Sequence, residues 1–491
     1  MRGECIKVID TPEFQRLRDV KQLGTSYFVF PGACHNRFEH SLGVCHLAEE
    51  MVLRLKRAQP ELEITNNEVK QVAIAGLCHD LGHAPFSHVF DNEFLPAMLD
   101  SEEQIKSFGT HEKMSIRLLD QIRDKEYVDD DILSSEDVRH IEDLICASCS
   151  DHHATHFKGR SFLTEIVANG RNSIDVDKFD YLERDCFYCG VKASCDFRRV
   201  MPFLKVIDDT ICFKASEVHN IYDIFHTRAS LHRRVYTHKV NKAIEYMVVD
   251  ALIEANQHFD ILNKARDPEH FIELDDSILK RIEYANPSGD DAGLRKAKEI
   301  VTRLRRRNIY KYVNEYCIPK DMLRNYRKVT AADVAGCQEV GKANGVQLRP
   351  EDLIVHNMKI DFCMKEKNPV DKVFFFQGLE STEKFTIQKE KVSSLLPDVF
   401  QERSVRLFVK DPKKLEAASI AFEAYQKREF GSPQQVSTPT INRNKGGPVS
   451  PYCETKLKVS FNPPKMGNPK RPLFAFKGSD ARREQPKRSR P

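Results

Sequence analysis

The sequence lacks the features of several large classes of protein. Its 491 residues contain no stretch of about 18 uncharged apolar residues, the length that a membrane-spanning helix requires. The first residues, Met1–Lys7, lack the apolar core of a secretion signal. There is no G-x-x-x-x-G-K-[ST] loop and no internal repeat. These absences argue against a membrane protein, a secreted protein, and a P-loop kinase or ATPase.

The 14 cysteines lack the spacing of a zinc finger. Cys186 and Cys189 form a C-x-x-C pair, but no second pair lies nearby in the sequence. Without a secretion signal, reduced thiols inside a cell are expected rather than a disulfide framework. We interpret most of these cysteines as small core residues.

The net charge of +3 hides an uneven distribution. Residues 431–491 contain 13 Lys and Arg against 3 Asp and Glu, a net of +10, which leaves −7 for residues 1–430. This segment also holds 10 of the 23 prolines. A segment this polar cannot bury enough apolar surface to offset the conformational entropy that it would lose on folding. We predict a disordered basic tail that serves in solubility, nuclear import or weak contact with single-stranded nucleic acid.

Apolar periodicity predicts a mainly α protein. Helical stripes run over 44–55 and 244–252. Short strands are predicted at 353–355, 372–376 and 405–409, followed by a helix over 411–428. We therefore predict a helical body over 1–330, a smaller α+β region over 331–430 that serves in regulation or oligomerisation, and the disordered tail over 431–491.

Adjacent His79 and Asp80 are the most informative feature. Ile74, Leu77, Cys78 and Leu81 recur at helical spacing, so we expect the pair to lie in a buried helix. A lone buried His is usually a hydrogen-bonded core residue. This pair has three more histidines and a downstream Asp cluster, and buried imidazole and carboxylate are costly unless they bind a partner or a cation.

The candidate metal ligands are His40, His79, Asp80 and Asp177. Imidazole and carboxylate suit iron, manganese, zinc, cobalt or nickel, and two of each leave positions open for a water that the metal acidifies. An anionic substrate would be met by nearby cations, namely Arg37, Lys178, Arg228, Arg233 and Arg234. His83, His88 and His111 remain as acid–base candidates, which spacing alone cannot rank.

Four sequence blocks carry a resemblance. Residues 10–18, 30–43, 174–181 and 225–234 resemble the SAM- and HD-domain deoxynucleoside triphosphate triphosphohydrolases of vertebrates, within the HD-domain metal-dependent phosphohydrolases. The likeness runs from about residue 6 to 430. It implies hydrolysis of a dNTP at the α-phosphate to deoxynucleoside and triphosphate.

The resemblance also implies residue roles. His40, His79, Asp80 and Asp177 match the metal ligands, with iron favoured and zinc or manganese as alternatives, and Mg²⁺ accompanying the nucleotide phosphates. His111 matches the catalytic His that protonates the departing 5′-oxygen, and His83 and His88 match residues beside the metal or the phosphates. The remaining substrate contacts match Gln22, Leu23, Arg37, Lys178, Tyr181, Asp185, Arg228 and Tyr236. Asp185 would read the 3′-hydroxyl, while Gln22, Leu23 and Tyr236 would pack against the sugar and exclude a 2′-hydroxyl.

Members of the family are activated by nucleotides that join subunits into a tetramer. Asp10, Gln15, Arg18 and Arg307 match a guanine-selective GTP site. A second, dNTP site matches Val29, Phe30, Arg199, His238, Lys239 and Lys367. The chain begins within the family's usual sequence, and Lys214-Ala215-Ser216 departs from a basic-acidic-basic triplet. We therefore expect the SAM domain and several activator contacts to be missing, and a mostly monomeric or dimeric protein with weak activity at high GTP.

The resemblance implies a nuclear protein, partly cytoplasmic, that lowers dNTP pools and so restricts viral reverse transcription. In the tail, Ser432-Pro433 and Ser437-Thr438-Pro439 resemble proline-directed phosphosites, and 470–474 resembles a cyclin-docking motif for a cyclin-dependent kinase. Two alternatives remain open at this point. One is another HD phosphodiesterase or nuclease, and the other is an inactive HD scaffold that binds nucleic acid.

Overall fold

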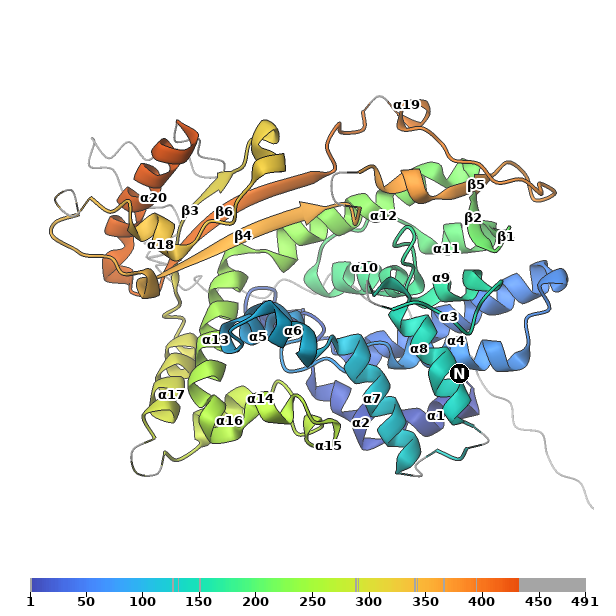
Figure 1. Cartoon of the computed structure of the whole chain (residues 1–491), viewed down its shortest axis with the longest axis horizontal. Coiled ribbons are helices and arrows are strands. Elements are labelled where there is room, and N and C mark those ends of the chain that lie inside the picture. The colour runs from blue at the N-terminus through green and yellow to red at the C-terminus, as the bar shows by residue number, and fades with distance from the viewer. Residues whose placement is uncertain are drawn as a thin grey trace, which may run out of the picture. The chain divides into compact units, whose positions relative to one another are not determined.

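The computed structural model describes residues 2–431, apart from 126–127, 131, 150–151, 288, 290, 340, 342, 365–366 and 394. The predicted tail over 431–491 lies outside the described residues, except for Gly431. The described chain is mainly α-helical, as predicted, with strands concentrated in its C-terminal part (Figure 1).

Helices supply most of the structure. Over residues 2–200 they are α1 (Gly3–Ile9), α2 (Pro12–Gln15), α3 (Arg37–Ala58), α4 (Asn66–Cys78), α5 (Leu95–Met98), α6 (Glu102–Phe108), α7 (His111–Asp124), α8 (Ser135–Ile145), α9 (Thr164–Val167), α10 (Val176–Cys189) and α11 (Phe197–Val200). Beyond residue 200 they are α12 (Val218–Leu231), α13 (Lys239–Phe259), α14 (Ile261–Lys264), α15 (Pro268–Phe271), α16 (Ile278–Tyr284), α17 (Ala292–Arg305), α18 (Ala331–Ala335), α19 (Lys389–Val392) and α20 (Leu415–Phe430).

Within the described residues, six strands form two small sheets. They are β1 (Leu204–Ile207), β2 (Thr210–Lys214), β3 (Lys311–Cys317), β4 (Leu353–Asp361), β5 (Phe374–Phe376) and β6 (Gln401–Val409). In the first sheet β2 pairs antiparallel with β1 and parallel with β5. In the second, β6 lies between β3 and β4 and is antiparallel to both. The predicted strands correspond to β4, β5 and β6, and the predicted helix to α20, with shifted ends.

Helix α3 is central to the helical body and packs against α4 and α10. Its Val44, Ala48, Met51 and Leu55 are buried, which agrees with the predicted stripe. Burial of such an apolar face supplies most of the stability of a helix in a protein. Local signals set the helix ends. Thr65 and Glu68 form a reciprocal capping box at the start of α4, and α10 is capped at its C-terminus by Gly190, whose φ is 66°.

The prediction that His79 and Asp80 lie within a helix is wrong. Helix α4 ends at Cys78, and the pair occupies the turn that follows. The reason is a long-range contact with α7. A Cβ at Gly82 would lie only 2.1 Å from the carbonyl oxygen of His111, and the Ser115 hydroxyl accepts the Gly82 amide at 2.8 Å. The close approach of α7 thus fixes this turn. A helix that continued through residues 79–82 could not make the same contact with α7.

Most buried apolar residues of the described chain belong to a large core or to a smaller one. The large core runs through the helical body, while the smaller one joins β3, β4, β6, α18 and α20. Among the described residues, no helix combines the length and apolarity needed to cross a membrane. The large core of the helical body supports the helices that carry the candidate site residues.

Candidate metal centre and active site

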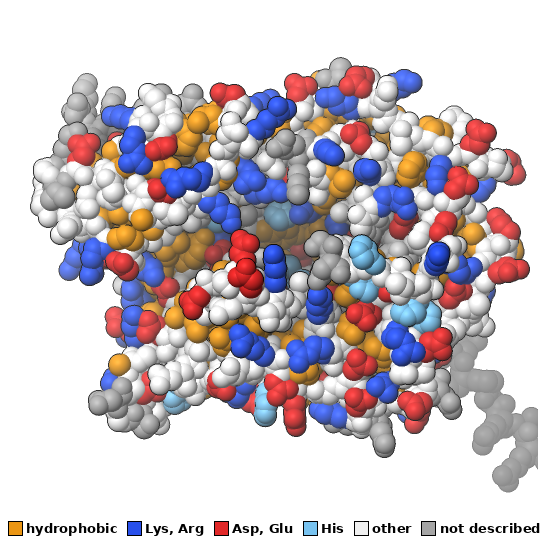
Figure 2. Space-filling view, viewed as in Figure 1, with side chains coloured by type: hydrophobic (Ala, Val, Ile, Leu, Met, Phe, Trp, Pro, Cys, Tyr) orange, Lys and Arg blue, Asp and Glu red, His pale blue; other side chains and the backbone are white. Residues whose placement is uncertain are grey.

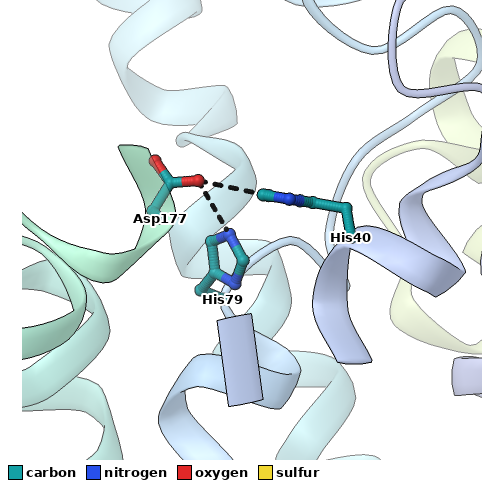
Figure 3. A group of neighbouring side chains, drawn as sticks. All are labelled: His40, His79 and Asp177. Carbon is teal, nitrogen blue, oxygen red and sulfur yellow. Dashed lines mark ion pairs between the residues drawn. The ribbon is translucent and has the colours of Figure 1, made fainter. Parts of the chain in front are cut away.

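His40, His79 and Asp177 converge from three elements. His40 lies in the first turn of α3, His79 directly follows α4, and Asp177 lies in the first turn of α10. Asp177 Oδ1 lies 3.1 Å from His40 Nε2 and 3.5 Å from His79 Nε2 (Figure 3). The ligand atoms of all three lie within 4.8 Å of one another. This is a donor set of two imidazoles and a carboxylate around one point.

The outer nitrogens of both imidazoles are held by the protein. His40 Nδ1 lies 2.7 Å from Asp180 Oδ2, and that carboxylate also accepts two hydrogen bonds from Arg184. His79 Nδ1 lies 2.9 Å from the carbonyl oxygen of Gly76. An Nδ1–H that donates to a carboxylate or carbonyl leaves the Nε2 lone pair free for a metal. Both Nε2 atoms are buried and have no hydrogen-bond partner within the described part of the chain, so the donor set fits a divalent metal.

Asp80 lies beside this group and connects it to Arg37. Its carboxylate is 3.3 Å from His40 Nε2 and 3.5 Å from His79 Nε2. Arg37 Nη1 donates to Asp80 Oδ2 at 2.5 Å, and both side chains are buried. Burial opposes ionisation of Asp80, but the charges of Arg37, His79 and His83 together outweigh it and hold the pKa of Asp80 well below its ordinary value. Asp80 is therefore an anion that can complete a metal site.

Three histidines form a second cluster next to the candidate metal centre. The rings of His83 and His111 are stacked with centroids 4.0 Å apart, and the ring of His88 lies edge-on to both. Asp91 Oδ2 is 3.5 Å from His111 Nδ1 and 3.8 Å from His83 Nδ1. Asp91 lies in a π-helical turn, Phe90–Phe94, a feature frequent at functional sites.

The stacked histidines have opposite pKa shifts. Burial disfavours the charged form of His111, but Asp91 and Glu112 outweigh it and raise the pKa of His111 to about 9. Burial, together with the charges of Arg37 and His111, lowers the pKa of His83 well below its ordinary value. His111 is thus the protonated member of the pair at neutral pH, which suits a general acid.

The two clusters line one cavity of about 730 Å³. In Figure 2 this face of the molecule is hollowed, with Lys and Arg side chains along the rim. Of the candidate ligand and acid–base residues, all but His40 line the cavity. So do all eight candidate substrate contacts, namely Gln22, Leu23, Arg37, Lys178, Tyr181, Asp185, Arg228 and Tyr236. The structure thus brings together residues that lie up to 214 positions apart.

Asp185 is held from both sides. Its Oδ1 lies 2.7 Å from His35 Nε2, and its Oδ2 accepts the Tyr236 hydroxyl at 2.6 Å. The His35 ring is stacked on Tyr188, with centroids 4.4 Å apart. A carboxylate fixed in this way can accept a hydrogen bond from a ligand hydroxyl without first losing conformational freedom.

The cations of the cavity differ in their placement. Lys178 Nζ lies 3.3 Å from Asp175, and Arg228 Nη1 donates to the carbonyl oxygen of Asp361 at 2.8 Å. The prediction that Arg233 and Arg234 also face the substrate is wrong. Both are exposed outside the described lining of the cavity, and Arg233 pairs with Glu402 at 2.8 Å. The π-helical turn His232–Tyr236 directs Tyr236, rather than these two arginines, toward the cavity.

Sequence reasoning assigned no role to Asp91, Asp180 or His35. Asp180 could have been found, because its i, i+3 spacing from Asp177 places both on one face of α10. His35 and Asp91 carry no comparable signal, since their partners are distant in sequence. Their roles appear only in the fold.

The ten activator candidates lie apart from this cavity. None is among the described residues that line it, and Arg18, Arg199, Lys239, Arg307 and Lys367 are exposed. Gln15 accepts a hydrogen bond from Arg18 at 2.8 Å, close to Asp10 at the end of α1. Arg307 donates to the carbonyl oxygen of Phe28, and the Phe30 ring packs edge-on against His238. Val29 is half-buried next to Phe30, and Arg199 pairs with Glu217.

Two family models match the chain. The HD domain model matches residues 37–185, which include all four candidate ligands, and the HD associated region matches residues 195–373. The chain is 46% identical over 436 residues to the deoxynucleoside triphosphate triphosphohydrolase SAMHD1 homolog of Dictyostelium discoideum, covering 89% of this chain and 80% of that protein. It is 40% identical over 448 residues to the deoxynucleoside triphosphate triphosphohydrolase SAMHD1 of Bos taurus and 39% identical over 477 residues to that of Homo sapiens. The shares covered are 85% and 90% of this chain, and 74% of each relative.

The chain belongs to the SAMHD1 family. The resemblance inferred from the sequence blocks is thereby confirmed, and so is membership of the HD superfamily. In this member of the SAMHD1 family, the HD domain and its His/Asp group indicate a divalent metal centre.

Proposed function

We propose that this chain is a metal-dependent dNTP triphosphohydrolase, which converts a dNTP and water to deoxynucleoside and triphosphate. The observation that supports this most directly is that one cavity contains a His/Asp metal group, the protonated His111 and three cationic side chains. The three cations are Arg37, Lys178 and Arg228. Three cations match the charge of a triphosphate. The SAMHD1 relatives are named for this reaction.

The chain's own residues account for most of the chemistry. His40, His79, Asp80 and Asp177 would hold a divalent metal, which when bound activates water and polarises a phosphoryl oxygen. The water oxygen would bond to the α-phosphorus, and the bond from that phosphorus to the 5′-oxygen would break. The proton that the water releases would pass to solvent, from which His111 is reprotonated after each turnover. His111 donates its proton to the 5′-oxygen as the bond breaks, and Asp91 stabilises the protonated imidazole beforehand. Arg37, Lys178 and Arg228 would balance the charge of the phosphates, and Asp185 would orient the deoxyribose.

Metal identity is part of the proposal. Two imidazoles and two carboxylates favour a transition metal over Mg²⁺, which prefers oxygen ligands alone. We propose iron at the His/Asp group, with zinc or manganese as alternatives, and Mg²⁺ bound with the nucleotide phosphates. Elemental analysis of purified protein tests the first half of this assignment.

We also propose that GTP and dNTPs regulate the enzyme at residues outside the cavity. The exposed Arg18 offers a guanidinium group beside Gln15, and the exposed Arg307 offers another beside Phe28; guanidinium groups suit nucleotide phosphates. Assembly into a tetramer and a nuclear role in limiting viral reverse transcription are proposals of the same kind.

Product analysis tests the proposed reaction. Purified protein loaded with iron or manganese is incubated with dGTP, with and without GTP, and the products are separated by chromatography. Equal amounts of deoxyguanosine and triphosphate are expected. Formation of dGMP and pyrophosphate, or cleavage of a nucleic acid, would favour another HD phosphohydrolase. Binding of nucleic acid with no hydrolysis of dGTP would favour the inactive scaffold.

A further inference from the structure

Two loops carry much of the cavity wall. The first loop, residues 21–24, presents Gln22 and Leu23, and the second loop, residues 81–88, presents His83 and His88. Ser87 in the second loop donates its hydroxyl to the carbonyl oxygen of Lys21 at 3.1 Å and accepts a hydrogen bond from Arg37 Nε at 3.1 Å. The positions of both loops and of Arg37 therefore depend on one another.

The second loop contains a strained turn. Phe86 and Ser87 have φ values of 61° and 54°, and neither is glycine. Two successive side-chain-bearing residues in the left-handed region are rare, and such strain persists only where the surroundings enforce it. The turn is also tightly packed, because a Cβ at Gly24 would lie 2.9 Å from the carbonyl oxygen of Phe86. Some group outside the loops must hold this geometry.

Asp276, just before α16, contacts both loops through their backbones. Its Oδ1 accepts the amide of Phe86 at 2.7 Å, and its Oδ2 accepts the amide of Lys21 at 3.0 Å. Its own amide donates to the carbonyl oxygen of Asp19 at 3.1 Å. One carboxylate thus joins the strained turn, which lies 190 positions away in sequence, to the start of the first loop, which lies 255 positions away.

Arg16 supports the same junction from another side. Its guanidinium donates to the carbonyl oxygens of Leu81 and His83 in the second loop, and to that of Leu274 near Asp276. The buried guanidinium and the Asp276 carboxylate together satisfy backbone donors and acceptors that the loops cannot pair between themselves. Neither Arg16 nor Asp276 is among the described residues that line the cavity.

We propose that Asp276 is a positioning residue of the active site, an inference that rests on the proposed function. It holds the strained Phe86–Ser87 turn and the first loop in register, and through Ser87 it fixes the Arg37 guanidinium beside Asp80. A carboxylate is required because both of its oxygens accept a backbone amide. An asparagine offers only one acceptor, and its amide group would face the second backbone N–H.

The test compares D276N with D143N. Asp143 is the control because it is a buried carboxylate outside the described lining of the cavity. Its Oδ2 accepts the amides of Thr155 and His156 at 2.8 and 2.7 Å, and its Oδ1 lies 2.9 Å from His152 Nε2. Metal content, melting temperature, kcat and KM for dGTP are measured well below the melting point of each variant. D276N should keep its metal and lose about 10- to 100-fold in kcat, since small misplacements of binding groups have costs of that size. D143N should keep its kcat.

Hydrogen–deuterium exchange gives a readout that does not depend on activity. In D276N the amides of residues 21–24 and 84–88 should exchange faster, while those of α3 and α10 remain protected. If D276N fails to fold, G24A perturbs the same turn from the opposite side and should give the same pattern of exchange and kcat.

Two results would overturn the inference. The first is that the amides of both loops exchange as slowly in D276N as in wild type. The second is that D143N loses as much kcat as D276N when both variants lose the same amount of melting temperature. A wild-type protein that binds metal but does not hydrolyse dGTP would instead refute the proposed function, and the exchange measurement would still decide the role of Asp276.

Discussion

The imidazole rings of His111 and His83 are stacked with centroids 4.0 Å apart and an interplanar angle of 17°. Two stacked imidazoles at this distance cannot both carry a charge at low cost. The nearby carboxylates of Asp91 and Glu112 assign the proton to His111, whose pKa is raised to about 9, whereas the pKa of His83 is held low. One member of the pair is therefore a proton donor and the other a neutral ring.

This relationship predicts the alkaline limb of the pH profile. A general acid works only in its protonated form, so kcat should be constant from about pH 7 and fall as the pH rises through about 9, the pKa of His111. H111Q should keep metal and bound dNTP, lose roughly two to four orders of magnitude in kcat, and lack this limb. Initial rates of triphosphate release between pH 6.5 and 10 measure both. A wild-type profile that stays flat to pH 10 would remove His111 from the role of acid.

The metal centre predicts the effect of removing its ligands. The double substitution His79→Ala and Asp80→Ala removes one imidazole and one carboxylate from the donor set, so both metal content and dNTP hydrolysis should be lost. His46→Ala is the matched control, because the His46 side chain is 71% exposed on α3. Elemental analysis and triphosphate release are measured on the same preparations. A double variant that retains metal and near-normal turnover would show that the site lies elsewhere.

The hydrogen bond between His40 and Asp180 predicts a weaker effect. D180N keeps an acceptor but loses the charge that orients His40 Nδ1–H and pairs with Arg184. Loss of such a partner usually lowers metal affinity by about 10- to 100-fold. Competition with a chelator of known affinity measures the change. Equal metal affinity in D180N and wild type would mean that the ring of His40 is held by packing alone.

Sequence patterns predicted those parts of the site that depend on local spacing. The helical stripe after His40 is an example, because a period of 3.6 residues reports directly on one buried face. The turn at His79 and Asp80 was missed because contact with α7, rather than local preference, ends α4. Strands β1, β2 and β3 were not predicted, and two of them, β2 and β3, pair with strands far along the chain, β5 and β6, so that local pattern alone does not report them. The contact of Asp276 with Lys21 spans 255 positions, so only the tertiary fold shows it.

The fixed Asp185 carboxylate predicts selection for a 3′-hydroxyl. Loss of a hydrogen bond to a charged acceptor costs about 1.5–3 kcal/mol, so wild type should prefer dGTP over dideoxy-GTP by roughly 10- to 150-fold in kcat/KM. Asp185→Ala should abolish most of that preference. H35A should reduce it in part, because Asp185 would keep the Tyr236 hydroxyl but lose its contact with His35. Competition between the two nucleotides measures the ratio, and equal ratios in wild type and Asp185→Ala would exclude this role.

The exposed Arg18 gives the last prediction, which concerns regulation. Its Nε donates to Gln15 and its guanidinium carbon lies 3.6 Å from the centroid of the Phe38 ring, while the exposed side chain still offers its Nη groups to a nucleotide phosphate. An activator shifts an assembly equilibrium only by its differential affinity for the assembled state. Arg18→Ala removes at least one charge-assisted hydrogen bond, worth about 1.5–3 kcal/mol, so the GTP concentration for half-maximal stimulation should rise by roughly tenfold or more.

Arg57→Ala is the control, because Arg57 is also exposed and, within the described residues, its only side-chain hydrogen bond is to the carbonyl oxygen of Leu53. Triphosphate release against GTP concentration, with sedimentation velocity in saturating GTP and dATP, measures stimulation and assembly together. Identical GTP dependence in the two variants would place the activator away from Arg18.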